Sequence, residues 1–377
     1  MSSNKVIFGR KQLASLKKIL KDYSSQKIFL VTGNKSYDYI NLSFNFESII
    51  KDFDTTRYHG FDVNPKLEEV IKGINIFKEF KPDIVVCIGG GSVIDIAKLI
   101  NALGSQNNDD YVKIIKENKL KTNGLPLIAI PTTSGTGSES THFAVVYIDG
   151  VKFSLSHASI LPTVAIVDPE LSFNTSSYLA ACTGMDALSQ AVESYWSNGA
   201  TKESLIYASE AISLINKSFV KSIKLKDLDA ICDMSKASNL AGQAINISKT
   251  TAPHAISYGI TATFSIPHGH AVALTLGRFF EINSDSQNKF SRETSNIKDH
   301  LLKMNNLFKL FNASSGKECY EKWKLLMKDI GLEISFSALG ANDNKAISNI
   351  IDNINLERLS NNPMIVSRDD LKSLFIT

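Results

Sequence analysis

Short apolar runs alternate with stretches of helical spacing in the first half of the chain. A helical pattern lies near residues 65–80. The apolar runs are KIFLVTG (27–33), DIVVCIGGGS (83–92), LPLIAIPTT (125–133) and VAIVDP (164–169). Strand, helix and parallel strand in this order are typical of a doubly wound α/β domain, which binds ligands at the carboxyl ends of its strands. We therefore predict such a domain over residues 1–176.

The second half has a different pattern, because long stretches such as 178–196 and 202–219 carry apolar residues at helical spacing. We predict an all-α domain over residues 177–377. A chain of 377 residues is long for a single core, and its hydrophobic content of 43% is sufficient for two. No long linker separates the halves, so we expect the two domains to pack around one cleft.

Composition argues against several classes of partner. The 41 Lys and Arg residues nearly balance the 38 Asp and Glu residues, which does not favour binding to nucleic acid or to a membrane. No segment has about 18 consecutive apolar residues, and the first residues do not resemble a signal peptide. The four cysteines include no C-x-x-C pair and fit reduced thiols. We expect a cytoplasmic protein with a small-molecule partner.

Two polar loops follow predicted strands and can bind a dinucleotide. The first loop consists of Gly90, Gly91 and Ser92. Its glycines let the backbone approach a pyrophosphate, and the N-terminus of the following helix attracts the anion. The second loop offers the hydroxyl groups of Thr132, Thr133 and Thr136. A tight turn without a ligand would explain one loop, but two loops at successive strand ends favour a dinucleotide.

The turn after the first predicted strand bears on the choice of cofactor. It reads Gly33, Asn34 and Lys35, without the acidic residue that would bind the ribose hydroxyls of NADH. Lys35 can instead pair with a 2′-phosphate. The turn therefore predicts NADPH over NADH, with a plain surface lysine as the alternative.

Four residues of the second half have the chemistry of a catalytic metal site. Asp186 and Gln190 lie four apart and project from one face of a predicted helix. His254 and His268 lie fourteen apart in a segment rich in small and polar residues. One carboxylate and two imidazoles can hold a metal ion and leave a position open for a substrate oxygen. The alternative is structural: a helix cap or solvated aspartate, and histidines that anchor loops.

Five motifs together resemble the iron-containing, or group III, alcohol dehydrogenases. The motifs are GGGSVIDIAK (89–98), PTTSGTGSE (131–139), VAIVDPEL (164–171), TGMDALSQAVESY (183–195) and H-x13-HG (254–269). The resemblance implies a nucleotide-binding α/β domain, a helical domain and a divalent iron or zinc ion in the cleft between them. It also implies a homodimer or a larger assembly.

The resemblance assigns roles to individual residues. It implies phosphate contacts for the Gly90–Ser92 loop, further cofactor contacts for the three threonines of the second loop, and a cleft role for Lys152. It implies that Asp186, His254 and His268 are metal ligands.

Two positions depart from the family pattern. Gln190 stands where the family usually has a histidine ligand, and an amide oxygen is a weaker donor for iron or zinc. Tyr258 stands where many members have a histidine that is thought to relay protons. Its phenol can donate a proton to a developing alkoxide, or its ring can pack against the substrate or the nicotinamide.

The segments INISKTTAPHAISYGIT (245–261) and HGHAVALTLG (268–277) resemble the phosphonoacetaldehyde reductase branch of this family. There, Lys249 with Thr250 and Thr251 would bind a dianionic phosphonate while the metal holds the aldehyde oxygen. Lys249 as a solvated surface residue is the alternative.

The sequence thus predicts NADPH-dependent, metal-assisted reduction of a small aldehyde, with phosphonoacetaldehyde as the leading substrate and 2-hydroxyethylphosphonate as its product. The competing hypotheses are another small-alcohol dehydrogenase of the family, a lyase or cyclase like 3-dehydroquinate synthase, which shares this architecture, and a metal-free binding protein.

Overall fold

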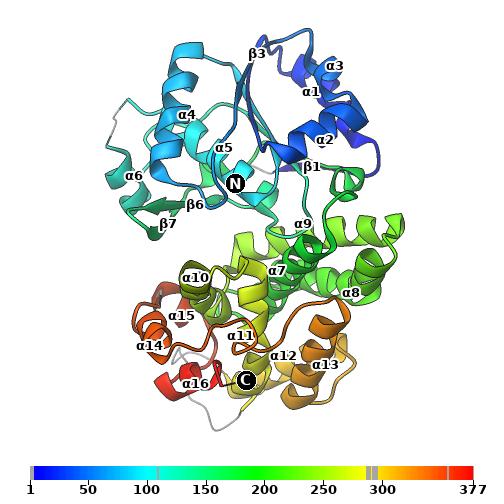
Figure 1. Cartoon of the computed structure of the whole chain (residues 1–377), viewed down its shortest axis with the longest axis vertical. Helices are drawn as coiled ribbons and strands as arrows, with labels where there is room; N and C mark the ends of the chain where they lie inside the picture. Colours follow the sequence, from blue (N-terminus) through cyan, green and yellow to red (C-terminus); the bar gives the residue numbers. More distant parts are fainter. Residues whose placement is uncertain (1–3, 108–109, 286–289, 291–295, 355, 377) are drawn as a thin grey trace. The chain divides into compact units, whose positions relative to one another are not determined.

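The computed structural model describes residues 4–107, 110–285, 290, 296–354 and 356–376. The chain divides into two compact units, Met1–Asn174 and Thr175–Thr377. The first is an α/β unit and the second is helical (Figure 1). The predicted order of a doubly wound domain followed by a helical domain is confirmed.

A six-stranded parallel sheet forms the centre of the first unit. Its strand order is β1-β8-β5-β4-β2-β3. In this order the strands are β1 (Lys5–Phe8), β8 (Val164–Val167), β5 (Leu127–Pro131), β4 (Ile84–Gly89), β2 (Lys27–Thr32) and β3 (Asp54–Tyr58). The chain runs from β2 outward to β3 and then returns to β4 on the other side of β2. The strand order therefore reverses between β2 and β4, the point at which doubly wound sheets bind their ligands.

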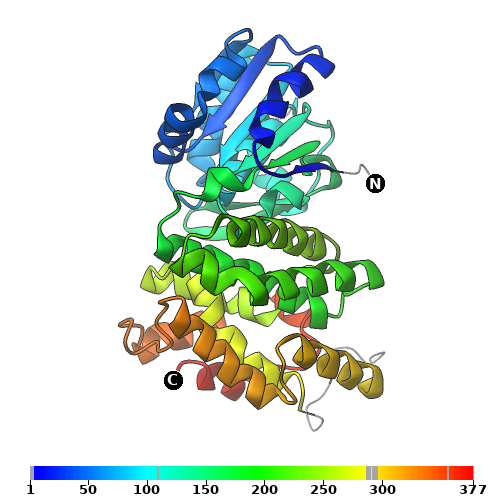
Figure 2. The same ribbon diagram turned by 90° about the vertical axis from the view of Figure 1, so that its right-hand side faces the viewer.

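Helices cover both faces of this sheet (Figure 2). The helices of the unit are α1 (Leu16–Asp22), α2 (Lys35–Phe44), α3 (Phe46–Ile50), α4 (Leu67–Phe80), α5 (Gly91–Gly104) and α6 (Tyr111–Glu117). In β4, Val85 and Cys87 join the core beneath α4 and α5, whereas Ile84 and Val86 join the core beneath α1, α2 and α3. Burial on both faces explains the continuous apolar runs of the sequence.

A hairpin that we did not predict lies between β5 and β8 in the chain. Its strands β6 (Phe143–Ile148) and β7 (Val151–Ser156) pair in antiparallel fashion. Asp149 and Gly150 form the turn, both with positive φ angles of 50° and 78°. Asp-Gly is a favoured pair for a two-residue hairpin loop.

The second unit contains only helices and connecting segments in the part of the chain that the structure describes, apart from one isolated bridge between Phe290 and Met364. Its helices are α7 (Ser177–Trp196), α8 (Lys202–Lys224), α9 (Leu228–Ser248), α10 (Ala252–Phe264), α11 (His268–Ile282), α12 (Ile297–Leu310), α13 (Gly316–Asp329), α14 (Asn344–Asp352), α15 (Leu356–Ser360) and α16 (Arg368–Ser373). Helix α7 packs against α8, α9 and α11, so most of its side chains are buried.

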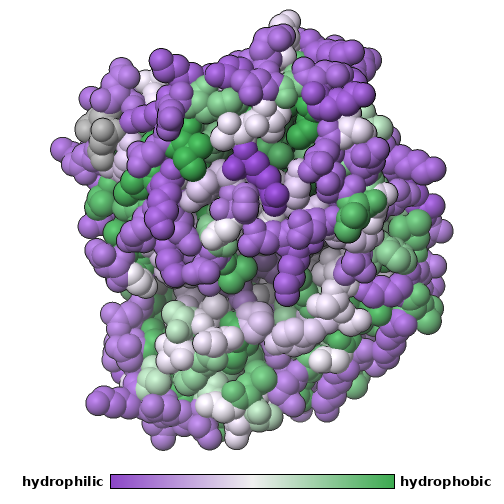
Figure 3. All heavy atoms as spheres, turned by 45° about the horizontal axis from the view of Figure 1, so that its top comes forward, coloured by the Kyte–Doolittle hydropathy of each residue, from purple (hydrophilic) through white to green (hydrophobic). Residues whose placement is uncertain are grey.

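On the face drawn in Figure 3, hydrophilic residues are spread widely and are interrupted by smaller hydrophobic areas. Among the described residues, no helix combines the length and the apolar character needed to span a bilayer.

Candidate functional site

Three metal-ligating side chains converge inside the second unit. Asp186 comes from α7, His254 from α10 and His268 from α11. One ligand atom from each residue lies within 4.8 Å of the others. The Nε2 atoms of His254 and His268 lie 3.2 and 4.0 Å from Oδ1 of Asp186. Asp186 and His254 are buried, whereas the His268 side chain is 33% exposed, so the group is accessible on the His268 side.

Helix starts and one glycine bring these side chains together. His254 lies in the first turn of α10, directly after a proline at the second position of that helix, and His268 begins α11 directly after Pro267. The next residue, Gly269, packs against α7 so closely that a Cβ atom there would lie 1.9 Å from the carbonyl oxygen of Cys182. Only glycine permits this approach, and the approach places His268 beside Asp186.

A fourth buried residue, Glu193, completes the group, and sequence reasoning did not identify it. Its side chain is fully buried, two helical turns after Asp186 on the same helix. Its carboxylate contacts Nδ1 of His254, and it accepts hydrogen bonds from the backbone N–H and the hydroxyl of Thr251, each at 2.9 Å. A glutamate seven residues after a candidate ligand on a helical stretch was the available signal.

The charges of this group favour a cation. Burial alone would raise the pKa of Asp186, but the hydrogen bond from His254 and the positive charges of His268 and His254 lower it overall. Burial would lower the pKa of His254, but Glu193 and Asp186 outweigh burial and raise that pKa to about 9. Two carboxylates therefore hold positive charge at this point. The donor set of one carboxylate and two imidazoles also fits a catalytic zinc or iron ion.

Gln190 lies beside Asp186, but it contacts the carboxylate through its amide nitrogen and not through the oxygen that we expected to bind a metal. It is buried, and its Nε2 atom donates a hydrogen bond to Oδ1 of Asp186 at 3.2 Å. In this arrangement the amide nitrogen faces Asp186 and orients the carboxylate. Metal ligation by the Gln190 oxygen stays a prediction.

Tyr258 lies against the exposed member of the group. Its ring stacks on the imidazole of His268, with the ring centroids 5.6 Å apart and the planes at 20°. The position fits an aromatic wall beside the candidate metal site. Proton transfer by the Tyr258 hydroxyl stays a prediction.

The segment expected to bind a phosphonate is only partly suited to that role. The Thr251 hydroxyl donates to Glu193 and accepts a hydrogen bond from Nε1 of Trp196 at 3.0 Å, so it is used inside the protein. Thr250 is buried, and its carbonyl accepts a hydrogen bond from Asn361. Lys249 is the C-cap that follows α9, has a positive φ angle of 61° and is exposed. Our interpretation of the Thr251 hydroxyl as a substrate contact is therefore wrong.

In the first unit, the two predicted cofactor loops lie side by side. They follow the neighbouring strands β4 and β5, where Gly89 is the register partner of Pro131. A Cβ atom at Gly91 would lie 2.6 Å from the side chain of Thr136, and one at Gly90 would lie 3.5 Å from Thr133. The Gly90–Ser92 segment also starts α5, so backbone N–H groups of a helix N-terminus lie beside hydroxyl groups of the second loop. Thr132 follows β5 directly.

A buried lysine that we did not predict supports the second loop. Nζ of Lys98 donates to the carbonyl oxygens of Ser138, Thr141 and Phe143 at 2.6, 2.9 and 3.0 Å. Asp95, one turn earlier on α5, accepts from the Ser138 hydroxyl at 2.6 Å. Burial lowers the pKa of Lys98 to about 8 although Asp95 opposes this shift.

Lys152 lies in β7, opposite Tyr147. Its charge acts on Asp95: burial raises the pKa of Asp95, and Lys152 is among the groups that oppose this rise. The predicted cofactor residue therefore lies in the same unit as the loops. Its contact with a cofactor stays a prediction.

The turn after β2 carries two basic side chains that sequence reasoning missed. Arg57 of β3 donates from Nε to the Thr32 hydroxyl at 2.7 Å and from its guanidinium to the carbonyl of Gly33 at 3.3 Å. Nδ1 of His59 lies 3.2 Å from the side-chain oxygen of Asn34. Lys35 is exposed at the start of α2. Arg57 of β3 and Lys35 of α2 thus place positive charge at this turn.

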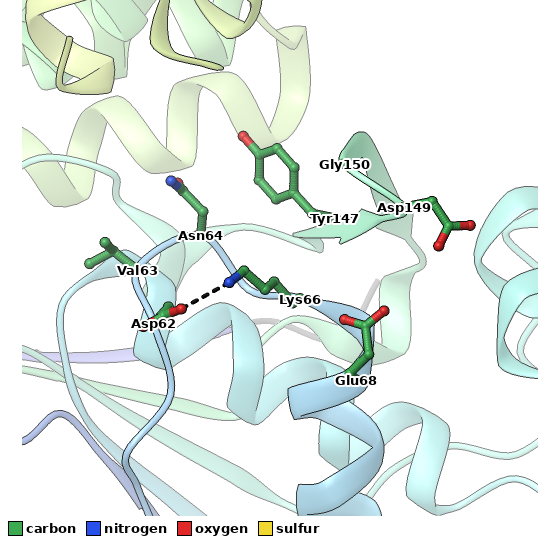
Figure 4. A pocket seen from close by; sticks show the side chains of 8 residues that line it. All are labelled: Asp62, Val63, Asn64, Lys66, Glu68, Tyr147, Asp149 and Gly150. Atoms are coloured by element: carbon green, nitrogen blue, oxygen red, sulfur yellow. Dashed lines mark hydrogen bonds and ion pairs between the residues drawn. The ribbon is translucent and has the colours of Figure 1, made fainter. Parts of the chain in front are cut away.

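A pocket of about 440 Å³ adjoins the first loop (Figure 4). It is lined by Asp62, Val63, Asn64, Lys66, Glu68, Tyr147, Asp149 and Gly150. The backbone N–H of Asn64 donates to the Ser92 hydroxyl at 3.4 Å, which connects the pocket to the Gly90–Ser92 loop. Its single ammonium group, on Lys66, pairs with Asp62 at 2.9 Å. With three carboxylates and one ammonium group, this pocket is poorly suited to a dianionic substrate.

Comparisons with known proteins agree with both halves of this description. A family model described as iron-containing alcohol dehydrogenase matches residues 3–169, and the C-terminal model of the Fe-containing alcohol dehydrogenase family matches residues 180–377. Long-chain-alcohol dehydrogenase 1 of Geobacillus thermodenitrificans is 32% identical over 315 residues, which cover 82% of this chain and 78% of that protein. Alcohol dehydrogenase 4 of Saccharomyces cerevisiae is 33% identical over 283 residues, 73% of each chain.

Solved structures show the same likeness. Sulfoacetaldehyde reductase from Bifidobacterium kashiwanohense, in complex with NAD+, matches with a TM-score of 0.88 and 26% identity over 100% of this chain and 97% of that chain. A 1,3-propanediol oxidoreductase matches with a TM-score of 0.83 and 26% identity over 99% of this chain and 97% of that chain. This chain therefore belongs to the iron-containing alcohol dehydrogenase family and is a nicotinamide-dependent oxidoreductase of alcohols and aldehydes.

Proposed function

We propose that the protein uses NADPH to reduce a small aldehyde that carries an anionic group, with phosphonoacetaldehyde as the leading substrate and 2-hydroxyethylphosphonate as its product. The observation that carries the proposal is the convergence of Asp186, His254 and His268, with donor atoms within 4.8 Å of one another and accessible on one side. A site that is accessible on one side leaves room for a carbonyl oxygen at the metal ion. A purely structural metal site would be enclosed by protein ligands on all sides.

Different residues of the second unit would bind the metal ion, orient its ligands and donate a proton to the reacting oxygen. When bound, a divalent ion supplies Lewis-acid stabilisation of negative charge, and the nicotinamide supplies the hydride. Asp186 and the two histidines would hold the ion, and Gln190 would orient the Asp186 carboxylate. Tyr258, stacked on His268, would exclude water from one side and can donate its phenolic proton to the product oxygen.

The preference for NADPH follows from the charges around the turn after β2. Arg57 and His59 contact this turn, and Lys35 begins the helix that follows it. A 2′-phosphate would gain charge-assisted hydrogen bonds from such groups, whereas NADH would find no carboxylate in Gly33, Asn34 and Lys35 to accept its ribose hydroxyls.

An anionic acetaldehyde is favoured as the substrate for two reasons. The sulfoacetaldehyde reductase acts on a two-carbon aldehyde with a sulfonate group, which is similar in size to a phosphonate and is also anionic. Lys249 lies at the end of α9, only two residues before the N-cap of α10, the helix that carries His254. Because the Thr251 hydroxyl is used inside the protein, recognition of the anion would depend mainly on Lys249.

A panel of aldehydes tests this proposal. Protein reconstituted with Fe²⁺ or Zn²⁺ would be assayed with phosphonoacetaldehyde, sulfoacetaldehyde and propionaldehyde, each with NADPH and with NADH. We expect the highest kcat/KM with phosphonoacetaldehyde and NADPH. Preference for propionaldehyde would reject the anionic substrate, and turnover without net oxidation of the nicotinamide would reject the reductase mechanism altogether.

A further inference from the structure

The Glu193 carboxylate faces hydrogen-bond donors at both of its oxygens. Oε1 accepts from the backbone N–H and the hydroxyl of Thr251, each at 2.9 Å, and from the backbone N–H of His254 at 3.3 Å. Oε2 contacts Nδ1 of His254. The Glu193 side chain is fully buried, and the His254 side chain is only 5% exposed. Water therefore does not compete for these bonds.

This arrangement determines which nitrogen of His254 is available to a metal ion. A carboxylate only accepts hydrogen bonds, so Nδ1 of His254 must carry a proton to contact Glu193. The other nitrogen, Nε2, donates to Oδ1 of Asp186 at 3.2 Å, where the three potential ligand atoms converge, and a bound ion would take the place of this proton. The imidazole thus presents the correct nitrogen, in a fixed orientation, to the candidate metal site.

We propose that Glu193 is a positioning residue for the metal site: it holds His254 in the Nδ1–H form and anchors the first turn of α10, so that Nε2 is ready to bind a divalent ion. The inference rests on the proposed metal-dependent function. Because Gln190 stands in place of the usual histidine, only three strong donors remain. The orientation of each donor therefore affects metal affinity more than it would in a site with four strong ligands.

A glutamine at this position cannot replace the carboxylate, although it has nearly the same shape. If the amide nitrogen of Glu193→Gln faced His254, it would donate to Nδ1 and favour the tautomer with the proton on Nε2, which cannot bind a metal. If the nitrogen faced Thr251 instead, it would oppose the backbone N–H groups of Thr251 and His254. Either orientation damages the metal site.

The experiment measures the dissociation constant for Zn²⁺ alone, by competition with a chromogenic chelator, for wild type, Glu193→Gln and Thr251→Val. We expect zinc binding by Glu193→Gln to weaken by roughly 10- to 100-fold, as is usual when the hydrogen-bond partner of a metal-binding histidine is lost. Thr251→Val removes one donor to Oε1 but leaves the contact between Oε2 and Nδ1, so its loss of affinity should be much smaller. Melting of the zinc-free proteins checks that both variants fold.

Zinc affinity of Glu193→Gln equal to that of wild type would overturn the inference while leaving the metal site in place. Wild-type protein that binds no zinc would reject the proposed function and the inference with it. If Glu193→Gln does not fold, ¹⁵N NMR of histidine-labelled, zinc-loaded wild type shows which nitrogen of His254 carries the proton. The His254→Gln variant assigns the signal. A protonated Nδ1 in His254 supports the inference, and a protonated Nε2 overturns it.

Discussion

The two units each contain a buried group of charged side chains, and the two groups are built differently. In the first unit, the ammonium group of Lys98 donates to carbonyl oxygens of one loop, so its hydrogen bonds hold that loop in place. In the second unit, one potential ligand atom each from Asp186, His254 and His268 lies near a common point, and His268 is partly exposed. Burial of charge alone therefore does not identify a ligand site. A ligand site is identified by metal-ligating atoms that converge on one point and can be reached from solvent.

The largest expected effect comes from removing an imidazole of the second group. His254→Ala or His268→Ala should lose most of the bound metal and reduce turnover by roughly 100-fold or more, because two protein ligands hold a catalytic ion poorly. The far-ultraviolet spectrum should stay that of a folded helical protein. Gln190→His, which adds a strong donor, should retain metal or bind it more tightly. Full metal content in either alanine variant would contradict the assignment of that histidine.

The next effect concerns the Lys98 group and should appear in stability. Lys98→Met leaves three carbonyl oxygens without their donor and removes the positive charge that opposes the burial-induced rise in the pKa of Asp95, and we expect a loss of about 3 to 5 kcal/mol in the free energy of unfolding. Urea denaturation measures this quantity. Lys72→Met, at an exposed position of α4, is the matched control and should change stability by less than about 0.5 kcal/mol. Equal losses of stability in the two variants would contradict a structural role for Lys98.

The pH dependence of stability sharpens the same point. Burial lowers the pKa of Lys98 from its ordinary 10.5 to about 8 in the folded protein. Between these values the unfolded chain binds a proton at Lys98 that the folded protein does not, so the contribution of Lys98 to stability must rise with pH. The cost of burying the charge is fully present below pH 8 and disappears toward pH 10.5.

Urea denaturation of wild type and Lys98→Met across this pH range tests the direction. The stability difference in favour of wild type should increase with pH, by at most about 3 kcal/mol. Because other titrating groups are common to both proteins, they largely cancel in the difference. A difference that stays constant or decreases with pH would mean that Lys98 keeps its proton in the folded state.

A smaller effect is expected for the substrate. Lys249→Ala should lower kcat/KM for phosphonoacetaldehyde by roughly 10- to 100-fold, because a charge-assisted hydrogen bond contributes about 1.5 to 3 kcal/mol. Propionaldehyde should lose far less, and Lys221→Ala, an exposed position on α8, should affect neither substrate. Equal losses for the charged and the neutral aldehyde would give Lys249 a general role in place of anion recognition.

The smallest effect is expected for cofactor choice. Gly33→Asp places a carboxylate where the 2′-phosphate of NADPH would lie and should reduce the preference for NADPH over NADH by roughly tenfold, about 1.4 kcal/mol. The new Cβ would lie 2.7 Å from the Ser36 hydroxyl, which can rotate away. Gly33→Ala has the same steric effect without the charge and should keep the preference. Similar kcat/KM of wild type with both cofactors would remove this argument.

The sequence was sufficient for the architecture and for the candidate ligands but not for the residues that hold them. Apolar runs that end in Gly90 or Thr132 identify strands with polar loops, because burial on both faces of a parallel sheet leaves a local pattern. The β6–β7 hairpin was missed although its Asp149–Gly150 turn is a local signal.

Glu193 and Lys98 are different, since their partners lie 61 and 40 residues away and are chosen by tertiary packing. A glutamate or lysine within a helical pattern reads as a solvated residue. The Thr251 hydroxyl was misassigned for the same reason, because Glu193 and Trp196 reach it from another helix. Long-range contacts of this kind produce no periodic pattern in the sequence, so they could not be predicted from it.

The most direct test of the account is the metal dependence of wild-type turnover. The protein would be stripped with a chelator and titrated with Fe²⁺ or Zn²⁺, while bound metal and NADPH oxidation with an aldehyde are measured together. We predict one divalent ion per chain and activity that rises in proportion to occupancy. Wild type that binds neither metal and still reduces the aldehyde at its full rate would contradict the assignment of Asp186, His254 and His268 as the catalytic metal site.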